Sequence, residues 1–173
     1  IYLAKIGGLM LLIVFSLKAA LLPLHLWLPA TYGRAMPVVA AQFAIMTKVG
    51  VYAIMRVFTV IFGEQAGELS GLASQWLWPL ALVTLVVGAV GVLAAEDLRR
   101  LSANLVIVSV GTLIAMVALN SEQVTAVAIF YMIHSTIACA AMFLVADMIA
   151  LQRGKVQDRF VNSRSVAEPK LLG

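Results

Sequence analysis

Three ionisable side chains stand deep inside long apolar stretches of this sequence: Lys18, Lys48 and His134. If each stretch is a membrane helix, a rise of about 1.5 Å per residue puts all three roughly 15–18 Å from the start of their helix, near the middle of a bilayer core about 30 Å thick. A lysine at that depth costs about 2.5–3.5 kcal/mol on insertion scales. Such residues normally face a protein interior or a water-filled cavity and mark ion or proton paths.

The chemistry of these three side chains suits proton transfer. A buried lysine can lose its proton, whereas arginine keeps its charge, and histidine changes charge near neutral pH. Each lysine taken alone could instead extend its ammonium group to the membrane surface, and His134 alone could be a hydrogen-bonded packing residue. Three such groups at one depth on three helices favour a polar axis that lies in the membrane plane and conducts protons.

Pro23 follows Lys18 in the stretch FSLKAALLPLHLWLPA, residues 15–30. Proline removes a backbone hydrogen bond and clashes with the preceding turn, which predicts a broken helix with free carbonyls around Ala19 and Ala20. Broken helices form ion sites in transporters. The alternative is a simple kink, but the neighbouring lysine favours a functional break.

A few further residues could extend such a path. His25 follows the break and could take up protons near the membrane surface, while the hydroxyls of Ser109 and Thr112 could hold waters or simply bond backbone carbonyls. Asp147 is expected to pair with one of three arginines, Arg99, Arg100 or Arg153. The sequence has no Gly-rich phosphate loop, metal-ligand cluster or nucleophile triad, so it predicts neither a cofactor nor a bound metal and gives no reason to expect bond-making chemistry.

These candidates need membrane helices to position them, and the composition indicates such helices. Of the 173 residues, 63% are hydrophobic and only 12% charged, with a mean hydropathy of +1.04, against about 45–50% and 25% in ordinary soluble domains. The pattern predicts an all-α, polytopic membrane helical bundle with the first helix broken near Pro23. Its five predicted transmembrane helices are 6–28, 37–62, 76–95, 101–119 and 124–151.

Residues 1–151 are thus expected to form a transmembrane domain, and 152–173 a cytoplasmic polar loop that leads to a further helix. The chain starts at Ile1 and ends in Leu171-Leu172-Gly173, where another apolar run could begin, so we expect an internal part of a longer protein. The single cysteine, Cys139, lies within an apolar run and forms no internal disulfide.

Lysine and arginine are unevenly distributed between the two predicted membrane sides. One side carries Arg34, Arg99, Arg100 and five basic residues of the tail, whereas the other carries Lys5 and Arg56. Basic residues favour the cytoplasm, so 29–36, 96–100 and 152–173 are predicted to be cytoplasmic. Topology in a lipid bilayer therefore explains the net charge of +4 better than a nucleic-acid partner does.

The stretch KAALLPLHLWLPATYGRAMPVVAAQFAIMTKVGVYAIMRVFTVIF, the link EDLRRLSA and the helix of His134 occur in an order that resembles a known family. This family comprises the antiporter-like membrane subunits shared by respiratory complex I and the multisubunit Mrp-type cation/proton antiporters. LPATY, TKVGVYAIMRVFTVIF and the tail RGKVQDRFV look most like the D-type branch of the Mrp antiporter subunits. Lys48, where the A-type branch has histidine, argues against the A-type.

The resemblance implies about helices seven to eleven of a fourteen-helix subunit. The residues matching Lys18, Lys48 and His134 belong to the family's central hydrophilic axis, in which Lys18 precedes a break in the seventh helix. The family's fifth-helix glutamate, which pairs with the lysine matching Lys18, and its twelfth-helix ionisable residue would lie outside this chain. Many complex I relatives carry histidine where this chain has Ser109, which leaves any proton path there to water or hydroxyls.

Three functions remain open at this point. The resemblance favours a proton-translocating subunit of a multisubunit antiporter, which works with other subunits and exchanges protons for Na+ or another monovalent cation across the cell membrane. The alternative is a proton-pumping, non-redox subunit of a complex I-type NADH:quinone oxidoreductase or a membrane-bound hydrogenase. A structural scaffold is the third, although a scaffold gains nothing from two buried lysines.

Overall fold

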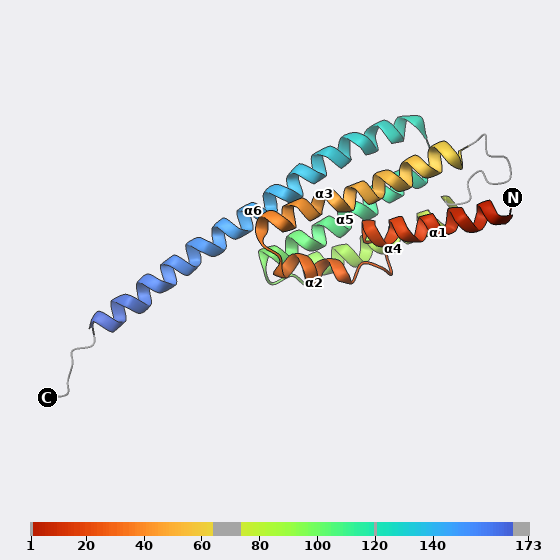
Figure 1. Ribbon diagram of the computed structural model, residues 1–173. Helices are drawn as coiled ribbons and strands as arrows, with labels where there is room; N and C mark the ends of the chain where they lie inside the picture. The colour runs from red at the N-terminus through yellow and green to blue at the C-terminus, as the bar shows by residue number, and fades with distance from the viewer. Residues whose placement is uncertain (1, 64–73, 120, 168–173) are drawn as a thin grey trace.

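The computed structural model describes residues 2–63, 74–119 and 121–167, and these residues form helices joined by short links (Figure 1). The helices in chain order are α1 (Tyr2–Ala19), α2 (Trp27–Arg34), α3 (Pro37–Arg56) with its π-helical continuation η1 (Val57–Ile61), α4 (Ser74–Leu93), α5 (Leu98–Ala118) and α6 (Glu122–Ala167). The described ranges contain no strand, which confirms the predicted all-α fold.

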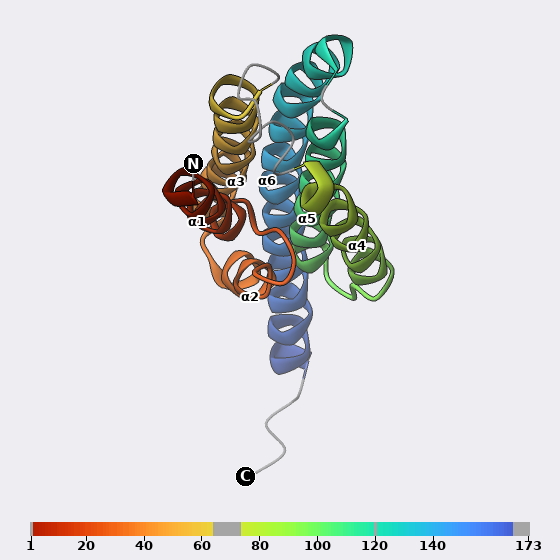
Figure 2. The same cartoon turned by 90° about the vertical axis from the view of Figure 1, so that its right-hand side faces the viewer.

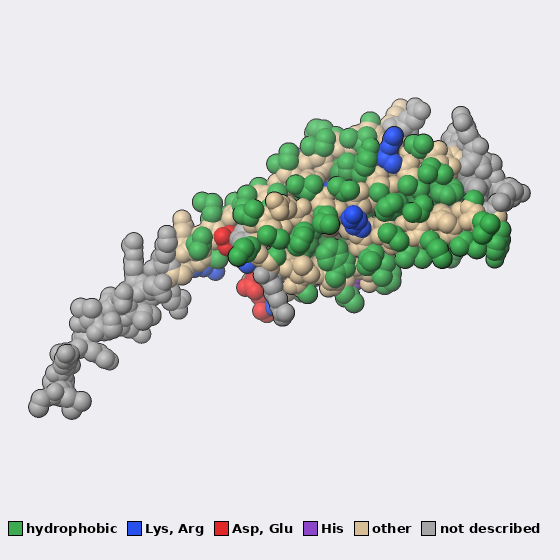
Figure 3. Space-filling model, viewed as in Figure 1, with side chains coloured by type: hydrophobic (Ala, Val, Ile, Leu, Met, Phe, Trp, Pro, Cys, Tyr) green, Lys and Arg blue, Asp and Glu red, His purple; other side chains and the backbone are tan. Residues whose placement is uncertain are grey.

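Five segments are long and apolar enough to cross a membrane, as predicted: Tyr2–Ala19, Val38–Ile61, Trp76–Leu93, Leu98–Ala118 and Gln123–Gly154. Figure 2 shows α5 between α4 and α6, with α3 packed on α6 and α1 on the outer side of α3. Hydrophobic side chains cover most of the outer face in Figure 3. A polytopic helical membrane protein has this distribution because its outer surface faces lipid or other membrane helices rather than water.

The predicted break in the first helix is confirmed, and it starts at Ala20, three residues before Pro23. Ala20 has a left-handed backbone (φ 58°). Its N–H donates to the carbonyl of Leu17 at 3.2 Å, and the N–H of Leu21 donates to the carbonyl of Ser16 at 2.9 Å. These two bonds form a Schellman motif, the arrangement that ends many helices, here with alanine where glycine is usual. The cap, rather than the ring of Pro23, therefore ends α1.

The segment between α1 and α2 is held inside the bundle by its neighbours. Ala20 and Leu21 are fully buried. The N–H of Leu22 donates to Oγ1 of Thr84 on α4 at 3.1 Å, and the indole N–H of Trp27 donates to the carbonyl of Leu17 at 3.2 Å. Polar groups freed by the break thus find partners within the protein, which is the condition for irregular backbone at membrane depth.

Helix α6 is longer than the sequence predicted. A polar loop was expected from residue 152, whereas the structure continues the helix to Ala167, and α6 extends beyond the bundle in Figure 1. Residues 152–167 contain no proline and several good helix formers such as Gln152, Arg153 and Lys155, so nothing in the backbone stops the helix where the apolar run ends. Residues 168–173 of the expected loop lie outside the described residues.

The core has two parts, and the second lies under α2. It combines Tyr32 of α2 with small residues of α3 and α5 and with Cys139 and Phe143 of α6. Alanines at positions 40, 44 and 103 leave room for the large ring of Tyr32. This second core cluster surrounds the polar groups described next.

Candidate functional site

Lys48 lies in the interior of the bundle. It belongs to α3, is only 3% exposed, and its ammonium nitrogen Nζ donates a hydrogen bond to Oγ of Ser109 on α5. Ser109 is also buried, and its hydroxyl donates to the backbone carbonyl of Val106 at 2.8 Å. The structure therefore brings together two of the residues that the sequence singled out.

Cys139 adds a third group to this site from α6. Its thiol is buried and lies close enough to Lys48 and Ser109 for both to act on it electrostatically. Cys139 had no predicted role beyond its place in an apolar run. A cysteine in such a run carries no signal of its own, because only the packing of α6 against α3 and α5 brings it within electrostatic range of a lysine.

Tyr32 is a fully buried tyrosine of α2 that belongs to the second core cluster, together with Cys139. Its ring packs against Phe143 of α6 and Phe43 of α3, with centroids 5.5 and 5.8 Å away. Burial raises the pKa of Tyr32; a weak hydrogen-bonding contact with Thr47 partly offsets this rise and Cys139 adds a little to it, so the hydroxyl stays protonated. Tyr32 was not among the residues predicted from the sequence.

The hydroxyl of Tyr32 makes no hydrogen bond of normal geometry among the described residues, and Thr47 offers it only a weak contact. The neighbouring hydroxyl of Thr47 donates its own proton to the carbonyl of Ala44 at 2.9 Å, which leaves the oxygen of Thr47 free to accept. A buried hydroxyl without a partner is uncommon in proteins and requires an explanation.

Lys18 and His134 take different positions from Lys48. Lys18 is in the last turn of α1, directly before the break, and its side chain is on the outer surface of the described bundle. His134 is on the exposed face of α6. Figure 3 shows Lys or Arg side chains set among hydrophobic ones on the face it draws. Among the described residues, neither Lys18 nor His134 forms a hydrogen bond or an ion pair with a residue of the Lys48 site.

The remaining predicted residues are less informative. The hydroxyl of Thr112 donates to the carbonyl of Val108, one turn earlier, at 3.0 Å, in line with the simpler of its two roles. His25 is half-buried in the break, and its Nδ1 atom is buried without a partner among the described residues. No three His, Cys, Asp or Glu side chains gather within the described ranges in a way that could hold a metal ion.

A polar pocket of about 710 Å³ opens at the end of the bundle where α2, the α4–α5 link and α6 meet. Its lining includes Ala30, Asn104 and Ala146 together with charged residues of the α4–α5 link. The described parts of the three segments that were predicted to share one membrane side therefore meet at one end of the bundle.

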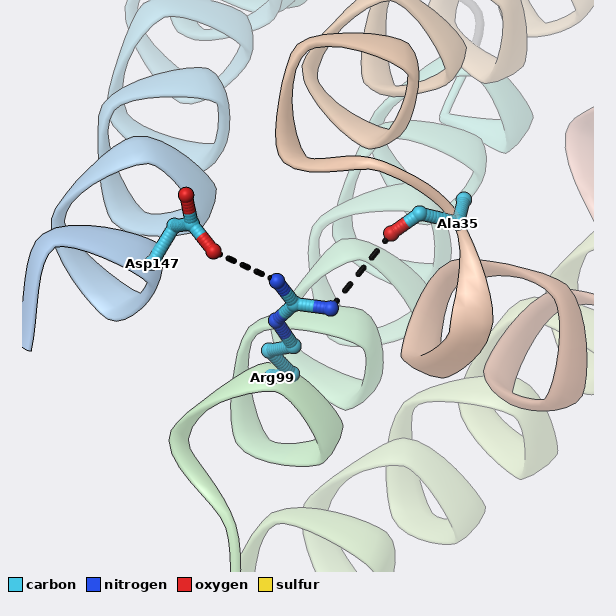
Figure 4. A network of polar contacts seen from close by, with 3 residues as sticks. All are labelled: Ala35, Arg99 and Asp147. Atoms are coloured by element: carbon cyan, nitrogen blue, oxygen red, sulfur yellow. Dashed lines mark hydrogen bonds and ion pairs between the residues drawn. The ribbon is translucent and has the colours of Figure 1, made fainter. Parts of the chain in front are cut away.

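An ion pair ties this end together. The guanidinium of Arg99 on α5 donates to the carboxylate of Asp147 on α6 at 2.6 Å and to the carbonyl of Ala35 at 3.5 Å (Figure 4). Of the three arginines considered as partners of Asp147, the structure selects Arg99. This residue links α5, α6 and the end of α2, and so fixes the wall of the pocket.

Comparisons with known proteins agree with this architecture. A protein of Rhizobium meliloti (strain 1021), named as a probable K(+)/H(+) antiporter subunit of the D type, is 40% identical over 153 residues, which cover 88% of this chain and 28% of that protein. A protein of Staphylococcus aureus (strain MRSA252), named as antiporter subunit mnhD2, is 35% identical over 163 residues, or 94% of this chain and 32% of that protein.

A solved structure, the Mrp complex from Dietzia sp. DQ12-45-1b, contains a chain that matches this fold with a TM-score of 0.71 and 30% identity. The match covers 80% of this chain and 25% of that chain. This chain thus spans about a quarter to a third of the length of the proteins that it matches.

The sequence model of the family described as "NADH:quinone oxidoreductase/Mrp antiporter, TM" matches residues 2–166. Since this match takes in α1 to α6 almost completely, the chain belongs to the transmembrane-subunit family of NADH:quinone oxidoreductases and Mrp antiporters.

Proposed function

We propose that this chain is part of a proton-translocating membrane subunit of a multisubunit monovalent cation/proton antiporter. Lys18, Lys48 and His134 are its proton-path residues, with His25 and Ser109 as further groups near the path. The observation that carries the proposal is the position of Lys48 inside the bundle, bonded to Ser109. The similarity to proteins named as antiporter subunits also supports this proposal.

The surroundings of Lys48 favour a role in proton transfer over a role in packing alone. Among the described residues it forms no ion pair, and its hydrogen bond goes to a neutral hydroxyl. A permanently charged ammonium in an apolar interior without a carboxylate is strongly unfavourable. Methionine or leucine would fill the same space without that cost, so a side chain that can bind and release a proton explains the site best.

The helix that bears Lys18 packs directly on the helix that bears Lys48. A Cβ atom added at Gly50, two residues after Lys48, would stand 2.8 Å from the backbone nitrogen of Ala19 and 3.1 Å from the carbonyl carbon of Lys18. A shift of the broken helix end is therefore transmitted to α3 near Lys48. This contact supports one path that includes both lysines.

In this function, protons cross from outside the cell through the subunit while Na+ or another monovalent cation leaves the cytoplasm. The outward faces that carry Lys18 and His134 are then covered by the remainder of the subunit or by other subunits of the complex, in the cell membrane. The family's description also includes NADH:quinone oxidoreductase, so a proton-pumping subunit of such an enzyme is the second candidate. The antiporter names of the relatives favour the first.

The test replaces Lys48 by methionine in the complete complex and measures cation-dependent proton exchange in membrane vesicles. Lys48→Met keeps the apolar length of the side chain, so we expect an assembled complex with exchange largely lost. Lys5→Met makes the same chemical change near the start of α1, away from the site, and is the matched control. Normal exchange by Lys48→Met would refute the proposal, and exchange that needs a redox substrate would favour the second candidate.

A further inference from the structure

We propose that Tyr32 is the hydroxyl link that carries protons between the polar pocket beside α2 and Lys48. The inference rests on the proposed function, because it gives Lys48 a route to one membrane surface. Tyr32 has no role in the sequence motifs or in the pairing of Lys48 with Ser109, so the inference adds a new residue to the path.

Tyr32 lies between the pocket and the lysine site. Along α6, Ala146 lines the pocket, Phe143 packs against the ring of Tyr32, and Cys139 is beside Lys48. Since helical residues rise about 1.5 Å each, the separation of seven positions between Cys139 and Ala146 corresponds to roughly 10 Å. Tyr32 is thus placed about midway along this short interval.

Helix α5 gives the same spacing independently. Asn104 lines the pocket, and Ser109 accepts the hydrogen bond of Lys48. Their separation of five positions along the helix corresponds to roughly 7.5 Å. A gap of roughly 7–10 Å is too wide for direct proton transfer, but one hydroxyl and one or two waters bridge it with ordinary hydrogen-bond lengths.

The hydroxyl of Tyr32 is what makes it a candidate for this bridge. The residue is fully buried, and its hydroxyl makes no hydrogen bond of normal geometry among the described residues, with only a weak contact to Thr47. Such a group costs about 1–3 kcal/mol, and phenylalanine would fill the same aromatic cage without that cost. The hydroxyl is therefore kept against a local penalty, as expected of a group that does something other than packing.

Polar groups stand on the inner side of this hydroxyl. The free acceptor lone pair of Thr47 and the thiol of Cys139 are its neighbours, and Cys139 in turn neighbours Lys48. A buried water needs about two to four polar partners, and Tyr32, Thr47, Cys139 and Lys48 together supply that number. We therefore infer a water between Tyr32 and Lys48.

Proton transfer along this route balances without any other reactant. A hydronium ion on the pocket side gives a proton to the oxygen of Tyr32 and becomes water, while the O–H proton of Tyr32 passes to the inner water and from there to the neutral amine of Lys48. Tyr32 gains one proton and loses one, so it never becomes a phenolate. The opposite sequence of the same steps releases a proton from Lys48 to the pocket.

The decisive variant is Tyr32→Phe in the complete complex, because the packing and relay roles predict different rates of exchange at the same stability. If Tyr32 only packs, removing an unpartnered hydroxyl leaves thermal stability equal or higher and exchange unchanged. If Tyr32 relays protons, stability is again equal or higher, but exchange slows by about a hundredfold or more, the low end of what a lost proton-transfer group costs. The solvent deuterium isotope effect on exchange also changes, which a packing role would not cause.

Tyr52→Phe is the matched control, since Tyr52 is on the outer face of α3 and 44% exposed. Lys48→Met, measured beside it, separates the two proposals. Loss of exchange in Lys48→Met with normal exchange in Tyr32→Phe would sink the relay and leave the proposed function standing. Equal slowing by Tyr52→Phe would sink the relay as well, whereas normal exchange in Lys48→Met would refute the proposed function itself.

A second pair of variants tests the inner side of the route without touching the aromatic cage. Thr47→Val removes the hydroxyl and keeps the shape, whereas Thr47→Ser keeps the hydroxyl. We expect Thr47→Val to slow exchange and Thr47→Ser to retain most of it. The double variant Tyr32→Phe/Thr47→Val should be no slower than Tyr32→Phe alone, because both interrupt one route, and additive slowing would contradict the proposal.

Discussion

Ala19 at the end of α1 and Gly50 in the middle of α3 are in direct backbone contact. A Cβ atom at position 50 would stand 2.8 Å from the nitrogen of Ala19 and 3.2 Å from its Cα atom. Real Cβ atoms do not approach backbone so closely, so any side chain at position 50 would push the two helices apart. The end of α1, which carries Lys18, therefore packs closely on α3, which carries Lys48.

Gly50→Ala should therefore destabilise the protein and disturb transport together. Overpacking a tight contact costs about 1–3 kcal/mol, because the neighbouring atoms here are backbone and cannot rotate away. Thermal unfolding of the purified complex and cation-dependent exchange measure the two effects. Gly7→Ala is the control, since nothing lies within 4 Å of its added Cβ and alanine favours a helix. Equal thermal stability and equal exchange in the two variants would contradict a tight backbone contact at Gly50.

Lys18 is expected to change its charge during transport rather than to act as a fixed charge. Lys18→Ala should abolish exchange without loss of assembly. Lys18→Arg should also be badly impaired, because a guanidinium keeps its proton at any working pH. Exchange in vesicles that contain the complete complex distinguishes the two roles. Near-normal exchange by the arginine variant would show that Lys18 only shapes the electric field.

Ser109 should matter through its bond to Lys48 rather than through the stability of α5. Ser109→Ala removes the acceptor of the Lys48 hydrogen bond and leaves a buried polar group unsatisfied, which costs about 1–3 kcal/mol. We expect altered exchange and a shifted pH profile. Ser102→Ala is the matched control, since Ser102 is also buried on α5 but donates to the carbonyl of Leu98 in its own helix. The hypothesis fails if both alanine variants behave alike.

The two ends of α5 should be accessible from opposite sides of the membrane, because its 21 residues reach about 30 Å. Single cysteines at Glu96 and at Gln123, each in a Cys139→Ser background, test this with an impermeant thiol reagent on intact cells. The cysteine at 96 should be labelled only after the membrane is opened, since the positive-inside rule predicts a cytoplasmic α4–α5 link. Labelling of both from outside would overturn this topology.

Much of the fold was readable from the sequence, because the signals involved are local. Five long apolar runs could only be membrane helices, since the bilayer requires every backbone polar group to be satisfied within the segment. Pro23 beside Lys18 marked the break, although the cap at Ala20 forms three residues earlier. The motifs around Lys18 and Lys48 also indicated the family that comparison then identified.

Only the tertiary structure decided which way each polar residue faces. Membrane helices that are apolar on all sides give no periodic pattern to mark an inner face, so the sequence could not distinguish the buried Lys48 from Lys18 and His134 on the outer surface. The grouping of Ser109 and Cys139 near Lys48, with Tyr32 near Cys139, joins residues from four helices. Such a site follows from how the helices pack, because side chains on different helices become neighbours through interhelical contacts that no single helix encodes.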